Sequence, residues 1–170
     1  MTYVWACLFA CLPIEADAGC RQALVLGLDV SGSVDATEYV LQRDGVANAL
    51  TRPAVQDVLF AQGSAPVSIA VFEWSGPQDQ NVILPWTVIS STDALFSATT
   101  QIRRHQRRNT TPTTAIESAM EFGATLLEQQ PACWKRTLDL SGDGRANTGP
   151  RPHTVVFPPV LQDITVNGLV

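Results

Sequence analysis

Residues 23–33 read ALVLGLDVSGS, and the change from apolar to polar side chains at Asp29 decides the fold. The apolar run before Asp29 is typical of a strand that is buried on both faces, as in a parallel sheet. A helix is expected soon afterwards, over residues 37–50, with Asp35 as its N-cap and Glu38 as the reciprocal acid. The segment therefore predicts a strand, a tight turn and a helix in succession.

The rest of the chain continues to alternate between strand and helix patterns. Residues 67–74 (VSIAVFEW) and 82–89 (VILPWTVI) predict two strands that pair antiparallel across a short turn, and Pro85 places the second at a sheet edge. Further elements are expected as helices over residues 92–104 and 114–128 and as strands over residues 137–140 and 164–170. This order predicts a doubly wound α/β fold, with an open, mostly parallel sheet, one antiparallel edge strand and helices on both faces.

Length and composition bound the class of protein. The 170 residues favour one domain, and 45% hydrophobic with 16% charged residues are enough for a packed core. The net charge of -5 argues against nucleic-acid binding, because such proteins need a basic surface to displace counterions. No nucleic-acid partner is therefore expected.

The N-terminal segment has the pattern of an export signal. Residues 3–14 form an apolar run that is too short to span a bilayer, and Ala16-Asp17-Ala18 follows as a small-x-small cleavage site. We therefore predict a signal peptide over residues 1–18, a domain over residues 19–170, and a secreted or periplasmic protein without a transmembrane segment in its mature chain. Because no positive residue precedes the apolar run, a buried first strand or an incomplete gene start stays open as an alternative.

Three side-chain oxygens alternate along the turn after the first predicted strand. Alternation directs Asp29, Ser31 and Ser33 toward one spot, and Gly32 allows the backbone to bend between the serines. One carboxylate and two hydroxyls are hard oxygen ligands, which suit Mg²⁺, Mn²⁺ or Ca²⁺ better than zinc or copper. The pattern predicts a divalent-metal site, and the alternative is that the serines only cap the next helix.

This Asp-x-Ser-x-Ser pattern resembles the metal-ion-dependent adhesion site of von Willebrand factor A domains. The resemblance covers residues 23–170 and is stronger to uncharacterised bacterial secreted members, through similar strings at residues 28–35, 69–76, 86–87 and 139–149. It implies that a threonine from a later loop, Thr114, and an aspartate after the fourth strand, Asp143, complete the site. Thr111 and Thr113 stay open in place of Thr114, since the glycines of the family pattern are missing, and Asp143-Gly144 is also a common turn pair.

The resemblance further implies a function. The hydroxyls of Ser31, Ser33 and Thr114 would bind the ion, while Asp29 and Asp143 act on it directly or through water. Mg²⁺ is the expected ion, with Mn²⁺ or Ca²⁺ as alternatives, and one coordination position is left for an Asp or Glu carboxylate of a partner protein. The expected function is metal-dependent protein–protein interaction without catalysis.

Two other functions stay open. A metal-assisted phosphatase or hydrolase could use the same acids. However, a haloacid-dehalogenase-like phosphatase needs a second aspartate where Ser31 stands, and the sequence has no Gly-x-Ser-x-Gly elbow or phosphate loop. The second alternative is a structural domain in which the site is unused.

Two cysteines remain after the predicted signal. Cys7 and Cys11 fall inside it, which leaves Cys20 and Cys133. In the fold that the chain resembles, the strands after these two cysteines are parallel neighbours, so a disulfide is expected at the sheet end opposite the metal. The resemblance also implies that a closing strand and helix are missing, so that the fold is truncated after the fifth strand.

Two charged features stand outside the motif. The basic run over residues 103–108 is expected to be a solvated helix end, and the alternative is that it rims the metal face and attracts acidic partners. Glu73 is expected either to support the metal ligands or to be a simple charge at the end of a strand.

Overall fold

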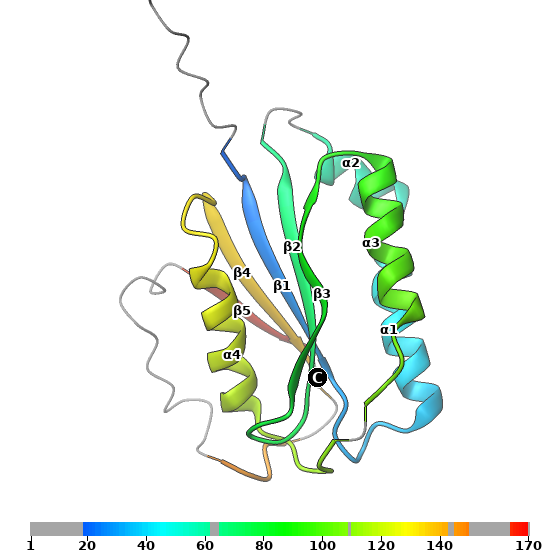
Figure 1. The fold of residues 1–170 in the computed structure, drawn as a ribbon, viewed down its shortest axis with the longest axis vertical. Helices are drawn as coiled ribbons and strands as arrows, with labels where there is room; N and C mark the ends of the chain where they lie inside the picture. Colours follow the sequence, from blue (N-terminus) through cyan, green and yellow to red (C-terminus); the bar gives the residue numbers. More distant parts are fainter. Residues whose placement is uncertain (1–18, 62–64, 109, 143–144, 150–163, 170) are drawn as a thin grey trace, which may run out of the picture.

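The computed structural model describes residues 19–61, 65–108, 110–142, 145–149 and 164–169. Most elements follow the predicted order, and the exception is a short helix that begins at Pro53, where only the end of the preceding helix was expected. Proline fits the first turn of a helix because its missing N–H has no partner there. The elements, labelled in Figure 1, are β1 (Gln22–Asp29), α1 (Ala36–Leu50), α2 (Pro53–Leu59), β2 (Val67–Trp74), β3 (Gln80–Ile89), α3 (Thr92–Arg104), α4 (Ile116–Glu128), β4 (Lys135–Ser141) and β5 (Ile164–Leu169).

The strands of the described residues form one sheet with the order β3-β2-β1-β4-β5. β1 pairs parallel with β2 and β4, and β4 pairs parallel with β5, whereas β3 pairs antiparallel with β2. This confirms the doubly wound, mostly parallel sheet with an antiparallel edge strand. Pro85 lies within that edge strand, where a missing N–H does not interrupt the interior of the sheet.

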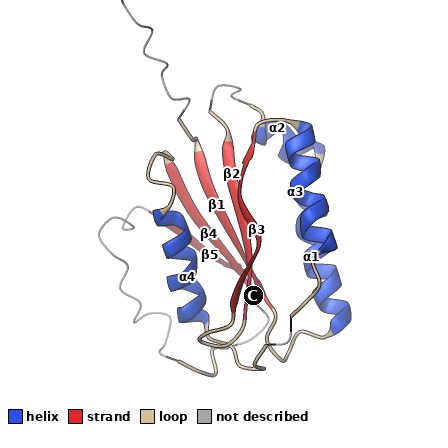
Figure 2. Ribbon diagram, in the orientation of Figure 1, coloured by secondary structure: helices blue, strands red, loops and turns tan. Residues whose placement is uncertain are grey.

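Helices cover both faces of the sheet (Figure 2). α1 and α3 pack together on one face, and α4 packs on β1 and β4 on the other. Successive side chains of β1 alternate between the two sides: Ala23 and Val25 pack with α4, while Leu24, Leu26 and Leu28 pack with α1 and α3. The apolar run is therefore buried from both sides, as the sequence predicts. None of the helices in the described part of the chain is long and apolar enough to cross a membrane.

The start of α1 confirms the predicted capping box. The Asp35 carboxylate accepts the backbone N–H groups of Thr37 and Glu38 at 2.7 and 2.8 Å, and Glu38 accepts the N–H of Asp35 at 2.8 Å. These bonds satisfy N–H groups that have no partner inside the helix. The loop that carries Ser31 and Ser33 is therefore held by β1 at one end and by a capped helix at the other.

The disulfide between Cys20 and Cys133 is present, with the two Cα atoms 4.3 Å apart. Each cysteine lies two positions before its strand, β1 or β4, and the N–H of Trp134 donates to the carbonyl of Cys20 at 2.9 Å. The predicted pairing is confirmed, and it lies at the end of the sheet opposite the loops that follow β1 and β2 (Figure 1). The predicted signal peptide, residues 1–18, lies outside the described residues.

Candidate metal centre

The Asp-x-Ser-x-Ser turn lies at the carboxyl end of β1, in the centre of the sheet. Asp29 and Ser31 are buried, with exposed fractions of 1% and 0%, whereas Ser33 is exposed. The N–H of Ser31 donates to Asp29 Oδ1 at 2.7 Å, which folds the turn back on its own carboxylate. The hydroxyl oxygens of Ser31 and Ser33 lie 3.1 Å apart. The structure therefore brings the two serine hydroxyls together beside a buried acid.

The segment between α3 and α4 lies directly against this turn. The N–H of Gly32 donates to the carbonyl of Pro112 at 3.1 Å, and a Cβ on Gly32 would stand 2.7 Å from the Pro112 Cβ. Only glycine permits this close approach. On its other side, the N–H of Ala115 donates to the carbonyl of Ser75, after β2, at 2.8 Å. Thr114, which is 4% exposed, is thus placed between the loops that follow β1 and β2.

The other two candidate threonines have partners elsewhere. Both the hydroxyl and the N–H of Thr111 donate to the carboxylate of Asp79, and the hydroxyl oxygens of Thr111 and Thr113 lie 3.2 Å apart. The hydrogen bond from the Thr111 hydroxyl lowers the pKa of Asp79 below its ordinary value, with smaller contributions from backbone N–H groups. Thr111 and Thr113 therefore belong to the Asp79 cluster, which favours Thr114 as the metal ligand.

Asp143 and Gly144 lie outside the described residues, but Gly142 before them and Asn147 after them contact other residues of the candidate site. A Cβ on Gly142 would stand 3.2 Å from Asp29 Oδ2. On the other side, the Asn147 side chain accepts the N–H of Thr114 at 2.9 Å, and the Asn147 N–H donates to the Thr114 carbonyl at 3.1 Å. The loop after β4 thus approaches both Asp29 and Thr114. Sequence reasoning gave Asn147 no role, because nothing local links it to a threonine in a distant loop.

The donor set fits a hard divalent cation. Hydroxyl and carboxylate oxygens are the ligands that Mg²⁺ and Ca²⁺ prefer. Over the described ranges, no three His, Cys, Asp or Glu side chains gather into a metal-binding group. Ser31, Ser33 and Asp29 supply neighbouring oxygens, and Thr114 lies in the segment packed against them.

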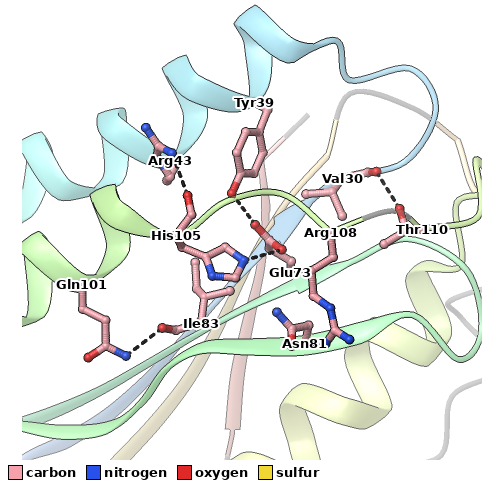
Figure 3. Close-up of polar contacts among 10 residues, drawn as sticks. All are labelled: Val30, Tyr39, Arg43, Glu73, Asn81, Ile83, Gln101, His105, Arg108 and Thr110. Atoms are coloured by element: carbon pink, nitrogen blue, oxygen red, sulfur yellow. Dashed lines mark hydrogen bonds and ion pairs between the residues drawn. The ribbon is translucent and has the colours of Figure 1, made fainter.

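Glu73 of β2 contacts side chains from two other parts of the chain, α1 and the residue that follows α3 (Figure 3). It is 1% exposed, and its carboxylate accepts the Tyr39 hydroxyl of α1 at 2.6 Å and lies 3.1 Å from His105 Nε2 at the end of α3. Burial, together with the hydrogen bond to Glu73, raises the pKa of Tyr39. Glu73 is therefore a buried polar link between β2 and its covering helices.

A small polar pocket of about 130 Å³ opens beside Glu73. It is lined partly by Asp79 and Asn81 of the β2–β3 region and by Arg108 and Thr110 of the segment after α3. The Arg108 side chain donates to Asn81 Oδ1 at 2.8 Å. Charged and amide groups thus surround a hollow between the β2–β3 region and the segment after α3.

The basic run over residues 103–108 is only partly the solvated helix end that was expected, since Arg103 and Arg104 do lie in the last turn of α3. The prediction of a simple solvated helix end is wrong for Arg107, which lies beyond α3 and donates to backbone carbonyls of the loop after β1. Arg108, next to it, is exposed. Sequence spacing could not separate the two arginines, because the difference depends on which of them meets a loop far away in the chain.

The strand order and the helices on both faces of the sheet are those of a von Willebrand factor A-like α/β fold. The family model described as "Protein of unknown function (DUF1194)" matches residues 19–170, and the chain belongs to this family. No curated protein matches the sequence.

Several solved structures share the fold. Proximal thread matrix protein 1 from the mussel byssus is 17% identical with a TM-score of 0.60, and the match covers 88% of this chain and 38% of that one. A second structure of that protein, with a TM-score of 0.62, is described as having a zinc-occupied MIDAS motif. The ArnB paralog VWA2 from Sulfolobus acidocaldarius is 13% identical with a TM-score of 0.57, over 88% of this chain and 34% of that one. The pilus adhesin SpaC from Lactobacillus rhamnosus GG is 18% identical with a TM-score of 0.54, over 75% of this chain and 15% of that one. The chain thus spans well under half the length of these proteins, and at such identities the likeness establishes the fold.

Proposed function

We propose that this protein is a metal-dependent protein-binding domain. Its hydroxyl ligands are Ser31, Ser33 and Thr114, and Asp29 and Asp143 are acids that act on the ion directly or through water. Mg²⁺ is the expected ion, because small hard cations take oxygen ligands and retain positions for further oxygens. The observation that carries the proposal is the adjacency of the Ser31 and Ser33 hydroxyls, 3.1 Å apart at the end of the central strand.

The chemistry of the donor set supports a binding role rather than catalysis. A bound cation that is held mainly by neutral hydroxyls would keep its attraction for an additional anionic oxygen. An Asp or Glu carboxylate of a partner protein is the ligand class that fits. The chain's own residues would hold the ion and orient it, and no general acid, general base or nucleophile is assigned among them. We accordingly expect no turnover in a screen of phosphate esters with Mg²⁺ present.

The proposal includes an exported location. The Cys20–Cys133 disulfide supports it, since such bonds persist in oxidising compartments. The similar structures include a thread matrix protein of the mussel byssus and a pilus adhesin, which agrees with this location.

The first test measures the affinity for the ion. We expect Asp29→Ala and Asp143→Ala to weaken Mn²⁺ or Mg²⁺ binding in titration calorimetry by about tenfold or more, the scale seen when support for a metal is lost. Asp57→Ala is the matched control, because Asp57 is exposed on α2 and should leave the affinity unchanged. Unchanged affinity in both site variants would contradict the proposal.

The second test concerns the partner. We expect the immobilised protein to retain host proteins in the presence of Mg²⁺ and to release them when a chelator is added. The Asp29→Ala variant should retain none of them, while Asp57→Ala should behave as the wild type. Retention that is insensitive to chelator would contradict a partner bound through the ion.

A further inference from the structure

The loop between β1 and α1 turns three backbone carbonyls toward one arginine. Arg107 donates from Nη1 to the Val34 carbonyl at 2.7 Å, and from Nη2 to the carbonyls of Val30 and Ser31 at 2.7 and 3.0 Å. Val30 and Ser31 are 1% and 0% exposed, so their carbonyls need partners inside the protein. A single guanidinium therefore spans the stretch of backbone that carries both Ser31 and Ser33.

We propose that Arg107 is a positioning residue for the metal site, an inference that rests on the proposed function. Arg107 and Thr114 both belong to the segment between α3 and α4. This segment makes further bonds to the same loop, from the Thr110 hydroxyl to the Val30 carbonyl at 3.3 Å and from the Gly32 N–H to the Pro112 carbonyl at 3.1 Å. Arg107 thus ties the loop with the serine ligands to the segment with the threonine ligand.

Ser31 makes contacts through its carbonyl, its N–H and its hydroxyl. Its carbonyl accepts from Arg107, its N–H donates to Asp29 Oδ1 at 2.7 Å, and its hydroxyl lies 3.1 Å from that of Ser33. The same carbonyl also accepts the N–H of Val34 at 3.1 Å. Loss of Arg107 would remove its bond to the Ser31 carbonyl. Only the contacts of Ser31 with Asp29, Ser33 and Val34 would then hold it in place.

Arg107 is itself held in position. Its guanidinium carbon lies 5.8 Å from the centre of the Tyr39 ring, and that of Arg43 lies 5.6 Å from the same centre. The Tyr39 hydroxyl donates to the buried Glu73 at 2.6 Å, which fixes the ring (Figure 3). A planar fork that bonds carbonyls and lies near an aromatic ring is a property of arginine that lysine does not reproduce.

The charge and the hydrogen bonds of Arg107 lead to opposite expectations. A positive charge near the site disfavours a divalent cation, so its removal alone would tighten metal binding. Loss of the three hydrogen bonds would instead release the loop and weaken metal binding. The sign of the change in affinity therefore separates a positioning role from a purely electrostatic one.

The experiment compares two neighbouring arginines in the full oxidised chain. Arg107→Met removes the charge and the bonds to the loop, whereas Arg108→Met removes an equal charge whose side chain bonds to Asn81 instead. Calorimetry with Mn²⁺ is expected to show about tenfold or weaker affinity for Arg107→Met, in the range found for residues that orient metal ligands. Arg108→Met should bind as tightly as the wild type or more tightly. Arg107→Lys keeps the charge and should remain weakened.

A second measurement needs no metal. Hydrogen exchange in the metal-free protein should be faster at the amides of Gly32 and Val34 in Arg107→Met than in the wild type or Arg108→Met. If Arg107→Met binds Mn²⁺ as tightly as the wild type, or if exchange in this loop is unchanged, the inference is overturned. If Arg107→Met does not fold, the same two criteria apply to Arg107→Lys. Absence of Mn²⁺ binding by the wild type would refute the proposed function, and hydrogen exchange would still decide whether Arg107 holds the loop.

Discussion

Thr111, Thr113 and Thr114 stand close together in the sequence, yet the structure gives them different partners. Thr111 bonds to Asp79 and lies beside Thr113, while Thr114 is buried and its backbone is held by Asn147. Sequence analysis favoured Thr114 but left the others open, because the difference depends on how the region after β2 folds against this segment. The adjacency of the Ser31 and Ser33 hydroxyls was easier to foresee, since their spacing along one turn is local.

The pKa of the Asp79 carboxyl should depend on the hydroxyl of Thr111. The Thr111 hydroxyl lowers the pKa of Asp79 below the ordinary value of 3.8. A carboxyl whose pKa is lower in the folded state stabilises the fold above pH 3.8, and this stabilisation is lost as the pH falls through the folded pKa. In Thr111→Val we expect the Asp79 pKa, measured by NMR titration of the carboxyl carbon, to rise toward the ordinary value. Thr125→Val on α4, whose hydroxyl donates to the backbone carbonyl of Glu121, is the control and should leave the Asp79 titration unchanged.

Among the elements, β1 and α1 follow most directly from their residues. The apolar run predicted a strand buried on both faces, and Asp35 and Glu38 predicted the start of the helix. The ends of the elements were harder to predict. α4 begins at Ile116 rather than at Thr114, and α2 begins at Pro53, where only the end of the preceding helix was expected. These boundaries depend on contacts with other segments, such as the bond from Ala115 to Ser75, which no local pattern encodes.

The link between β1 and β4 gives a prediction at the scale of elements. The Cys20–Cys133 disulfide joins positions 113 residues apart, and closing a loop of this length stabilises a protein by about 4–5 kcal/mol in the chain-entropy model. We expect the double variant Cys20→Ala/Cys133→Ala to lose about this much stability in urea unfolding. Its Mn²⁺ affinity should stay that of the wild type, because the disulfide lies at the opposite end of the sheet. A loss below about 1 kcal/mol would contradict the entropic account.

In the whole molecule, the disulfide and the loops of the candidate site lie at opposite ends of the sheet. The disulfide joins the amino ends of β1 and β4, and the loops after β1, β2 and α3 meet at the other end. This arrangement follows from the parallel pairing of the central strands, which brings their carboxyl ends together. A change at one end of the sheet should therefore leave the other end intact.

Binding of the ion to the folded state alone should stabilise the whole domain. At a free Mg²⁺ concentration about 100 times the Kd, the gain is about 2.7 kcal/mol, which corresponds to a rise in Tm of roughly 5–10 °C for a domain of this size. We expect this rise in thermal unfolding at constant ionic strength for the wild type and for Asp57→Ala. An equal rise in Asp29→Ala would mean that Mg²⁺ acts elsewhere on the protein.

The sequence by itself determined the strand and helix order, the capped start of α1 and the pairing of hydroxyls in the turn after β1. It did so because alternation, capping and tight turns are set by residues only a few positions apart. Only the tertiary structure decided that Arg107 holds this turn, that Asn147 holds Thr114 and that Thr111 belongs with Asp79. Each of these contacts joins residues more than thirty positions apart, so it forms only after the sheet has brought its loops to one end.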